Sequence, residues 1–195
     1  MSTAINGSAT LEDISPHPLA DLPEGTKNPL DYALTQRDGS TLAMVRAAVA
    51  HNQTLMAYQP VMRDADDPKI AFYEGFIRIL DPTGRVIPAR EFMPVVEKTQ
   101  LGREIDVLSL NAGLAALSEN KGLRLSINMS ARSIGYAGWT TLLNRWLSRD
   151  GTIGERLILE ISEKSAMQMP ELVASFMDQL QTRGVCFALD NFGSD

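Results

Sequence analysis

Short apolar runs alternate with amphipathic segments from Leu123 to the end of this 195-residue chain, and this alternation limits the fold more than any other feature. The strand-like runs are LRLSINMS, RLILEISE and VCFALDN, and the segments between them are WTTLLNRWLSR and PELVASFMDQLQTRG. Those two segments carry apolar residues three and four positions apart, as surface helices do. Pro170 suits a first helical turn and Gly184 a helix C-terminus. Strand, helix and strand at this spacing predict a parallel α/β sheet.

The part of the chain before this alternation predicts helices and one antiparallel hairpin. Two strand-like runs, 55–62 and 70–80, are joined by the short polar segment RDADDPK, which favours an antiparallel pairing. Helical periodicity follows in 88–100 and 103–120, and a further helix is expected from Ser40, which can cap its first turn. We therefore expect an α/β fold of about five strands with one antiparallel strand near the start.

Residues 1–38 show no sustained apolar periodicity and are rich in Ser, Thr, Pro, Gly and Asp. This composition is typical of a flexible segment, so we predict a flexible leader over 1–38 and a folded domain over 39–195. The N-terminus has neither the basic nor the apolar region of a signal peptide, and no run reaches the ~18 apolar residues of a membrane span. We expect a cytoplasmic protein with no membrane span.

The overall charge argues against one class of partner. A formal net charge of -6 does not favour a surface that binds a nucleic acid polymer or an acidic membrane through its overall electrostatics. The single cysteine, Cys186, cannot form an internal disulfide, and its place in the apolar run VCFAL predicts a buried thiol. A reducing compartment suits such a thiol.

Four successive predicted strands each carry an acidic or amide residue where a buried strand is otherwise apolar. These residues are Glu74, Asn128, Glu160 and Asp190, the last followed directly by Asn191. An unpaired buried carboxylate is costly, so each requires a cation or hydrogen-bond donors. Oxygen ligands from several strand ends suit a hard divalent cation such as Mg²⁺, Mn²⁺ or Ca²⁺. The carboxyl ends of parallel strands are also where α/β folds place their sites.

Each of these residues also has a purely structural interpretation. A single Asp or Asn at a strand end commonly forms a turn or caps a helix. Glu163 can cap the segment that follows ISEKS, and Arg78 can be a solvated residue or an ion-pair partner of Glu74. The coincidence across four strands favours one shared site over separate caps.

The same residues fall within six motifs that follow one another along the chain. The motifs are AYQPVM, YEGFIRI, EFMPVVEKT, INMSAR, LEISE and ALDNFGS. From Leu55 to the last residue this series resembles the EAL domain, a bacterial family of cyclic di-GMP phosphodiesterases. The family's own motifs include E-A-L-x-R, N-x-S-x-R, E-x-T-E and D-D-F-G-T-G. Each match is weak singly, and six in the family's order are specific.

The resemblance implies a TIM-type (β/α)₈ barrel with one antiparallel strand near its start and a two-metal site at its C-terminal end. In the family, two Mg²⁺ or Mn²⁺ ions activate a water that attacks one phosphodiester of cyclic di-GMP and yields linear pGpG. By the same resemblance, the catalytic residues are Glu74 and Asp190. The implied metal ligands are Glu74, Asn128, Glu160, Asp190 and, weakened, Asn191; the implied substrate-binding residues are Gln59, Phe76 and Arg78; and Glu163 is expected to brace a loop.

Two departures from the family pattern bear on activity. Gly75 and Phe76 stand in place of the Ala and Leu of the EAL signature, and Asn191 stands in place of the second Asp of the D-D pair. An amide oxygen coordinates without charge, so we expect a weakened second metal site. The alternative function is therefore a catalytically inactive EAL-like module that binds cyclic di-GMP or docks a partner protein. The resemblance also allows a homodimer through this domain.

The chain is shorter than the ~250 residues of a typical complete barrel. Five predicted strands leave the domain over 39–195 short of the last three β/α units, and the family's catalytic lysine, a later glutamate and a later glutamine have no counterpart before residue 195. We expect either part of a longer protein or a degenerate module that needs a partner, and no appreciable hydrolysis by these 195 residues alone.

Overall fold

The computed structural model describes residues 28–64, 66 and 68–193. The chain divides into two compact units, Met1–Ser40 and Thr41–Asp195. The first helix, α1, spans Pro29–Ala50 and so begins well before the expected Ser40. Asn28 explains the early start, because its Oδ1 accepts the backbone N–H of Asp31 at 2.9 Å and Pro29 suits a first helical position. The predicted flexible leader is thus helical from Pro29, and its remaining residues, 1–27, lie outside the described residues.

Strands β1 (Thr54–Met62) and β2 (Ile70–Leu80) form the predicted antiparallel hairpin, with Gln59 directly opposite Glu74. A short strand, β3 (Val86–Pro88), also pairs antiparallel with β2. The sequence pattern does not indicate β3, because three residues are too few to show the alternation of a strand.

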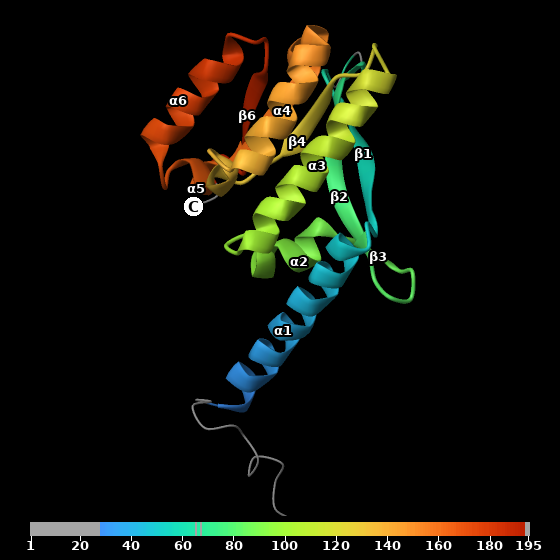
Figure 1. The fold of residues 1–195 in the computed structure, drawn as a ribbon, viewed down its shortest axis with the longest axis vertical. Helices are drawn as coiled ribbons and strands as arrows, with labels where there is room; N and C mark the ends of the chain where they lie inside the picture. Colours follow the sequence, from blue (N-terminus) through green and yellow to red (C-terminus); the bar gives the residue numbers. More distant parts are fainter. Residues whose placement is uncertain (1–27, 65, 67, 194–195) are drawn as a thin grey trace, which may run out of the picture. The chain divides into compact units, whose positions relative to one another are not determined.

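Helices and parallel strands alternate through the rest of the described chain (Figure 1). The elements are α2 (Ala89–Val96), α3 (Gln100–Glu119), β4 (Leu125–Asn128), the 3₁₀ helix η2 (Ala131–Ser133), α4 (Ala137–Arg149), the 3₁₀ helix η3 (Gly151–Arg156), β5 (Leu157–Ser162), α5 (Glu163–Ala166), α6 (Pro170–Gln181) and β6 (Cys186–Asp190). The strand order is β1-β2-β4-β5-β6, with β3 beside β2 and parallel pairing from β2 to β6. Among the described residues β1 and β6 do not pair, so this mixed six-stranded sheet is open, as predicted for an incomplete barrel.

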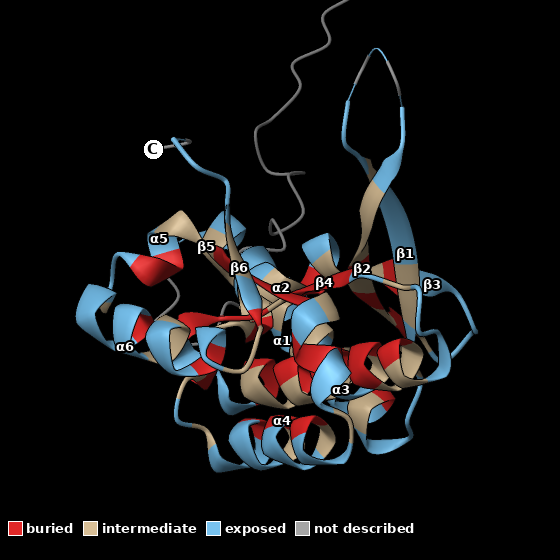
Figure 2. Ribbon diagram, turned by 90° about the horizontal axis from the view of Figure 1, so that it is seen from above, coloured by how far each residue is buried: buried red, intermediate tan, exposed pale blue. Residues whose placement is uncertain are grey.

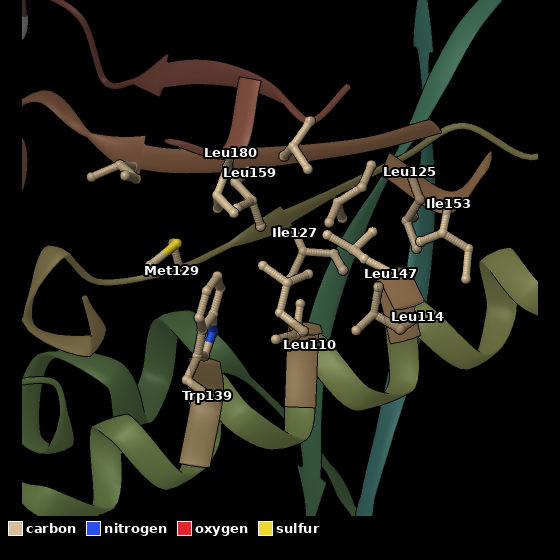
Figure 3. Close-up of a cluster of buried hydrophobic side chains, with 14 of the residues drawn as sticks. Leu110, Leu114, Leu125, Ile127, Met129, Trp139, Leu147, Ile153, Leu159 and Leu180 are labelled. Atoms are coloured by element: carbon tan, nitrogen blue, oxygen red, sulfur yellow. The ribbon is translucent and has the colours of Figure 1, made fainter. Parts of the chain in front are cut away.

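The larger hydrophobic core lies between the sheet and helices α3, α4 and α6. Figure 3 shows Leu110 and Trp139 pointing from the helices toward Ile127 and Met129. Each such side chain stabilises the fold by about 1.5–3 kcal/mol when fully buried. Gly113 lets α3 approach β4 closely, because a Cβ at this position would overlap the side chain of Ile127. Trp139 of α4 is nearly inaccessible and packs in this core.

A second core fills the space between β2, β3, α2 and α3. It contains Ile79, Ile87, Phe92, Val96 and Ile105, all of them buried. This core holds α2 and the start of α3 beside the C-terminal half of β2, where they form one wall of the cavity described below. None of the helices in the described part of the chain combines the length and apolarity needed to cross a membrane.

Helices cover one face of the sheet, and the other face carries both polar and apolar side chains of the strands. In β2, Gly75, Ile77 and Ile79 are buried on the covered face, whereas Glu74, Phe76 and Arg78 are only partly buried on the other. Figure 2 shows α3 and α4 together on one side of the strands.

Cys186 is exposed, so the prediction of a buried thiol is wrong. It lies on the edge strand β6, and the next residue, Phe187, takes the covered face and packs against Phe176 of α6 at 5.8 Å between ring centroids. Neighbouring residues of a strand point to opposite faces, so Cys186 is left on the open face.

Candidate active site at the carboxyl ends of the strands

The predicted metal ligands lie on the open face of the sheet near one edge. Strands β2, β4, β5 and β6 are parallel, so their carboxyl ends meet at that edge. Cross-strand partners share a face, and the register places Glu74 opposite Ser126, Asn128 opposite Glu160, and Asp190 opposite Ser162. The four predicted ligands therefore occupy three successive positions of one face.

The oxygen atoms of this set are not yet gathered around one point. Successive positions on one face of a strand are ~7 Å apart, so long side chains must converge from different levels. Asn128 reaches Glu74 and donates its amide N–H to Oε1 at 2.9 Å. Among the described residues, no three Asp, Glu, His or Cys side chains are close enough to form a metal-binding group by themselves.

Glu160 is the most perturbed carboxyl of this face. Glu160 is buried, 8% exposed, on β5 between β4 and β6. Burial is the main reason that its pKa rises to about 7; the carboxylates of Glu74 and Asp190 raise it further, and the Ser126 hydroxyl acts in the opposite direction. A cation near these carboxyl groups would relieve both effects.

Asp190 and Asn191 form a compact local pair at the end of β6. The backbone N–H of Asn191 donates to Oδ1 of Asp190 at 2.8 Å, and its side-chain amide donates to Oδ2 at 2.8 Å. Asn191 adopts a φ of 55°, a conformation in which Asn is tolerated better than most residues. Both oxygens of the predicted bridging ligand therefore accept hydrogen bonds from its neighbour.

A cavity of about 400 Å³ opens beside these residues. Five of the predicted site residues line it: Glu74, Phe76, Asn128, Asp190 and Asn191. Helices α2 and α3 supply the opposite wall, which includes Ala89, Arg90, Met93, Glu97, Ile105 and Asp106. The cavity thus combines acidic groups with apolar surface, as sites for small molecules commonly do.

The other predicted site residues lie around this cavity without lining it. Gln59 is exposed on β1 directly opposite Glu74, and Arg78 lies on the open face of β2 four residues beyond Glu74. Glu163, the first residue of α5, accepts the backbone N–H of Gly193 at 2.8 Å through Oε2. This hydrogen bond crosses from the segment after β5 to the segment after β6. The loop-bracing role of Glu163 stays a prediction.

The sequence patterns do not identify a buried carboxylate on α3. Asp106 is 4% exposed and accepts hydrogen bonds from the Ser130 backbone and the Ser133 hydroxyl. One signal in the sequence points to it: Asp106 interrupts the apolar face of a helix in the run EIDVLSL. A charged residue at such a position requires a partner in the fold.

Comparison with known proteins identifies the family of this chain. The family model described as the EAL domain matches residues 42–195. An uncharacterized signaling protein of Caulobacter vibrioides is 30% identical over 162 residues, which are 82% of this chain and 20% of that protein. The cyclic di-GMP phosphodiesterase PdeB of Shewanella oneidensis is 29% identical over 201 residues, 97% of this chain and 24% of that protein. The chain thus spans a fifth to a quarter of the length of these relatives.

Solved structures show the same architecture. The MucR phosphodiesterase in complex with c-di-GMP matches with a TM-score of 0.64 and 26% identity, over 80% of this chain and 64% of that one. The FimX EAL domain of Xanthomonas citri in complex with c-di-GMP matches with a TM-score of 0.71 and 23% identity, over 84% of this chain and 65% of that one. The second likeness concerns the fold alone. The chain belongs to the EAL domain family.

Proposed function

We propose that this chain provides the metal-binding half of a cyclic di-GMP phosphodiesterase site, which opens one phosphodiester to give linear pGpG. The observation that carries the proposal is the row of Glu74, Asn128, Glu160 and Asp190 on the open face of four neighbouring parallel strands. Relatives named cyclic di-GMP phosphodiesterases and the structure of a phosphodiesterase in complex with c-di-GMP support the substrate.

The donor set fits a hard divalent cation. Three carboxylates and one amide oxygen are ligands that Mg²⁺ and Mn²⁺ prefer. Burial first, and then the nearby carboxylate of Glu74, raise the pKa of Glu160, and a bound cation would counter both effects. Asn128 now turns its N–H toward Glu74, so holding a cation requires it to present its amide oxygen instead. When bound, such ions lower the pKa of a water and neutralise charge on the phosphoryl oxygens.

The remaining residues of the site would hold the nucleotide. Phe76 gives the cavity an apolar wall for the guanine or ribose, and Gln59 lies across from Glu74 with donors and an acceptor for a guanine edge. Arg78 carries the charge and planar group that suit a phosphate. Glu163 holds the backbone that follows Asp190 and so limits its movement.

The test combines metal binding, nucleotide binding and product analysis. Calorimetry with Mn²⁺ should show binding that Glu160→Gln weakens about 10-fold or more, because that change removes a charged ligand. Glu155→Gln is the matched control, since Glu155 is an exposed glutamate of η3, which precedes β5. Chromatography of cyclic di-GMP incubated with Mn²⁺ then reports pGpG, which we expect from a protein that carries the complete domain and not from these 195 residues alone. Wild-type protein that binds neither Mn²⁺ nor cyclic di-GMP would contradict the proposal.

A second candidate is a module that binds cyclic di-GMP without hydrolysis. The pairing of Asn191 with both oxygens of Asp190 favours it, because the family's second aspartate is replaced by a neutral donor that occupies the expected bridging ligand. Tight binding of cyclic di-GMP with no pGpG at saturating Mn²⁺, measured on a protein that carries the complete domain, would establish this function. If the protein neither binds nor hydrolyses cyclic di-GMP, docking of a partner protein is the function that is left.

Two further expectations belong to this proposal. We infer a cytoplasmic location, since cyclic di-GMP is a signalling nucleotide of the bacterial cell interior. A homodimer through the EAL domain stays a prediction, and light scattering of the purified protein with and without cyclic di-GMP measures it directly.

A further inference from the structure

Asp106 is a buried carboxylate to which the proposed chemistry gives no part. It lies on α3 with 4% of its surface exposed and lines the cavity wall that faces the strand ends. Within the described residues no Lys, Arg or His forms an ion pair with it. Isolated buried carboxylates are costly, so the hydrogen bonds made by Asp106 must offset its burial.

Both of these hydrogen bonds go to the segment that follows Asn128. Oδ2 of Asp106 accepts the backbone N–H of Ser130 at 3.0 Å and the hydroxyl of Ser133 at 2.5 Å. Ser130 is the N-cap of η2 and Ser133 is its last residue, so one carboxylate oxygen holds both ends of this single turn. A charged acceptor makes such bonds roughly twice as strong as neutral ones.

The same turn is tied to the segment after β5. The backbone N–H of Ala131 donates to Oγ of Ser165 at 3.1 Å, and the N–H of Ser165 donates to Oγ of Ser162 at 3.2 Å. Ser162 precedes Glu163, whose carboxylate accepts the N–H of Gly193. A continuous set of hydrogen bonds therefore runs from α3 through the segments that follow β4, β5 and β6.

We propose that Asp106 is a positioning residue that fixes η2 and thereby the position of Asn128 at the end of β4, beside Glu74. Ser130 is the second residue after Asn128, so a shift of η2 moves the end of β4. The strand itself offers little resistance there, because Asn128 is its last residue. The inference rests on the proposed function in that Asn128 is taken as a metal ligand. Replacing a residue that positions a metal ligand without itself contacting the metal typically lowers metal affinity about 10–100-fold.

The experiment compares Asp106→Ala, Asp106→Asn and Ser133→Ala with the wild type at pH 7.5. Ser109→Ala is the control, because Ser109 is a buried residue of the same helix and lines the same cavity. The first readout is Mn²⁺ affinity by calorimetry. The second is amide hydrogen exchange of residues 129–135, which requires no metal.

Asp106→Ala should weaken Mn²⁺ binding at least about 10-fold and speed exchange in 129–135 about 10-fold, as the loss of a charge-assisted hydrogen bond implies. Asp106→Asn keeps one acceptor oxygen, so its Mn²⁺ affinity and its exchange in 129–135 should lie closer to those of the wild type. Ser133→Ala should change both quantities in the same direction as Asp106→Ala, but less. Ser109→Ala should change neither. If Asp106→Ala fails to fold, the Asn and Ser133 variants carry the comparison.

Unchanged Mn²⁺ affinity in every folded Asp106 variant would overturn the inference, even if those variants unfold at lower temperature. Unchanged exchange in 129–135 would overturn it as well. If the wild type binds no Mn²⁺, the proposed function fails on its own. Hydrogen exchange then still decides whether Asp106 fixes η2. Faster exchange confined to residues 129–135 in Asp106→Ala supports this role, and an exchange rate that rises equally along the whole chain rejects it.

Discussion

Replacing Asp106 by Asn should flatten the dependence of stability on pH. Burial is the main reason that the pKa of Asp106 rises from its ordinary 3.8 to about 6; the Ser133 hydroxyl and the Ser130 N–H lower it, and the nearby charge of Glu97 raises it. At about 1.4 kcal/mol for each pH unit, this difference amounts to about 3 kcal/mol between the fully protonated and fully ionised carboxyl.

The direction of the effect follows from proton binding. Between pH 3.8 and about 6 the folded state holds the proton of Asp106 more tightly than the unfolded state does, so stability falls as pH rises through this range. The stabilisation that comes from proton binding by Asp106 is complete below pH 3.8 and is lost above about pH 6. About 2 kcal/mol of the loss should fall between pH 4 and pH 7. The amide of Asn does not titrate, so Asp106→Asn should not show this loss of stability.

The assay is urea unfolding at several pH values from 4 to 7.5, with wild type and Asp106→Asn compared at each. The difference in unfolding free energy between the two proteins should change by about 2 kcal/mol across the range, in favour of the variant as pH rises. Taking the difference cancels Glu160, which titrates in both proteins. Ser109→Ala should keep the wild-type slope. If the unfolding free energies of wild type and Asp106→Asn change equally with pH, the raised pKa of Asp106 is refuted.

Three further outcomes are expected. Asn191→Asp should lower the melting temperature without metal, because a carboxylate replaces a donor to Asp190, and should bind a second Mn²⁺ more tightly; an unchanged metal titration contradicts this. Gly113→Ala should destabilise the protein by about 1–3 kcal/mol despite the better helix propensity of Ala, since the new methyl overlaps Ile127, and chemical unfolding measures it. Arg78→Ala should weaken the binding of cyclic di-GMP about 10-fold or more in calorimetry and leave Mn²⁺ affinity unchanged. An equal loss of affinity for the nucleotide and for Mn²⁺ would show that Arg78 supports the fold and not phosphate binding.

Strand and helix positions were accessible from the sequence wherever an element is long enough to show its period. The run 70–80 coincides with β2, and the polar interruptions at Glu74, Asn128 and Glu160 do lie together on one face. Their convergence could be predicted because the carboxyl ends of parallel strands share an edge and residues two apart share a face. Their assignment as ligands remains a prediction.

Other features depended on contacts between distant parts of the chain. Cys186 looks like a core residue in its apolar run, but its burial depends on which face of β6 the helices cover. Asp106 is held by Ser130 and Ser133, 24 and 27 residues further along the chain, and no local pattern reveals such pairing. The early start of α1 is a different case, because Asn28 and Pro29 are local signals outweighed by the polar composition around them.

The sequence by itself determined the alternation of strands and helices, the motif order of the EAL domain and the residue types offered to a cation, because each is written in local periodicity and spacing. The tertiary structure alone decided the register that sets Glu74, Glu160 and Asp190 at three different levels, and the exposure of Cys186. It also decided the hydrogen bonds that run from α3 to the segments after β4 and β5. Register and burial arise from packing between elements far apart in the chain, and that packing has no local signature.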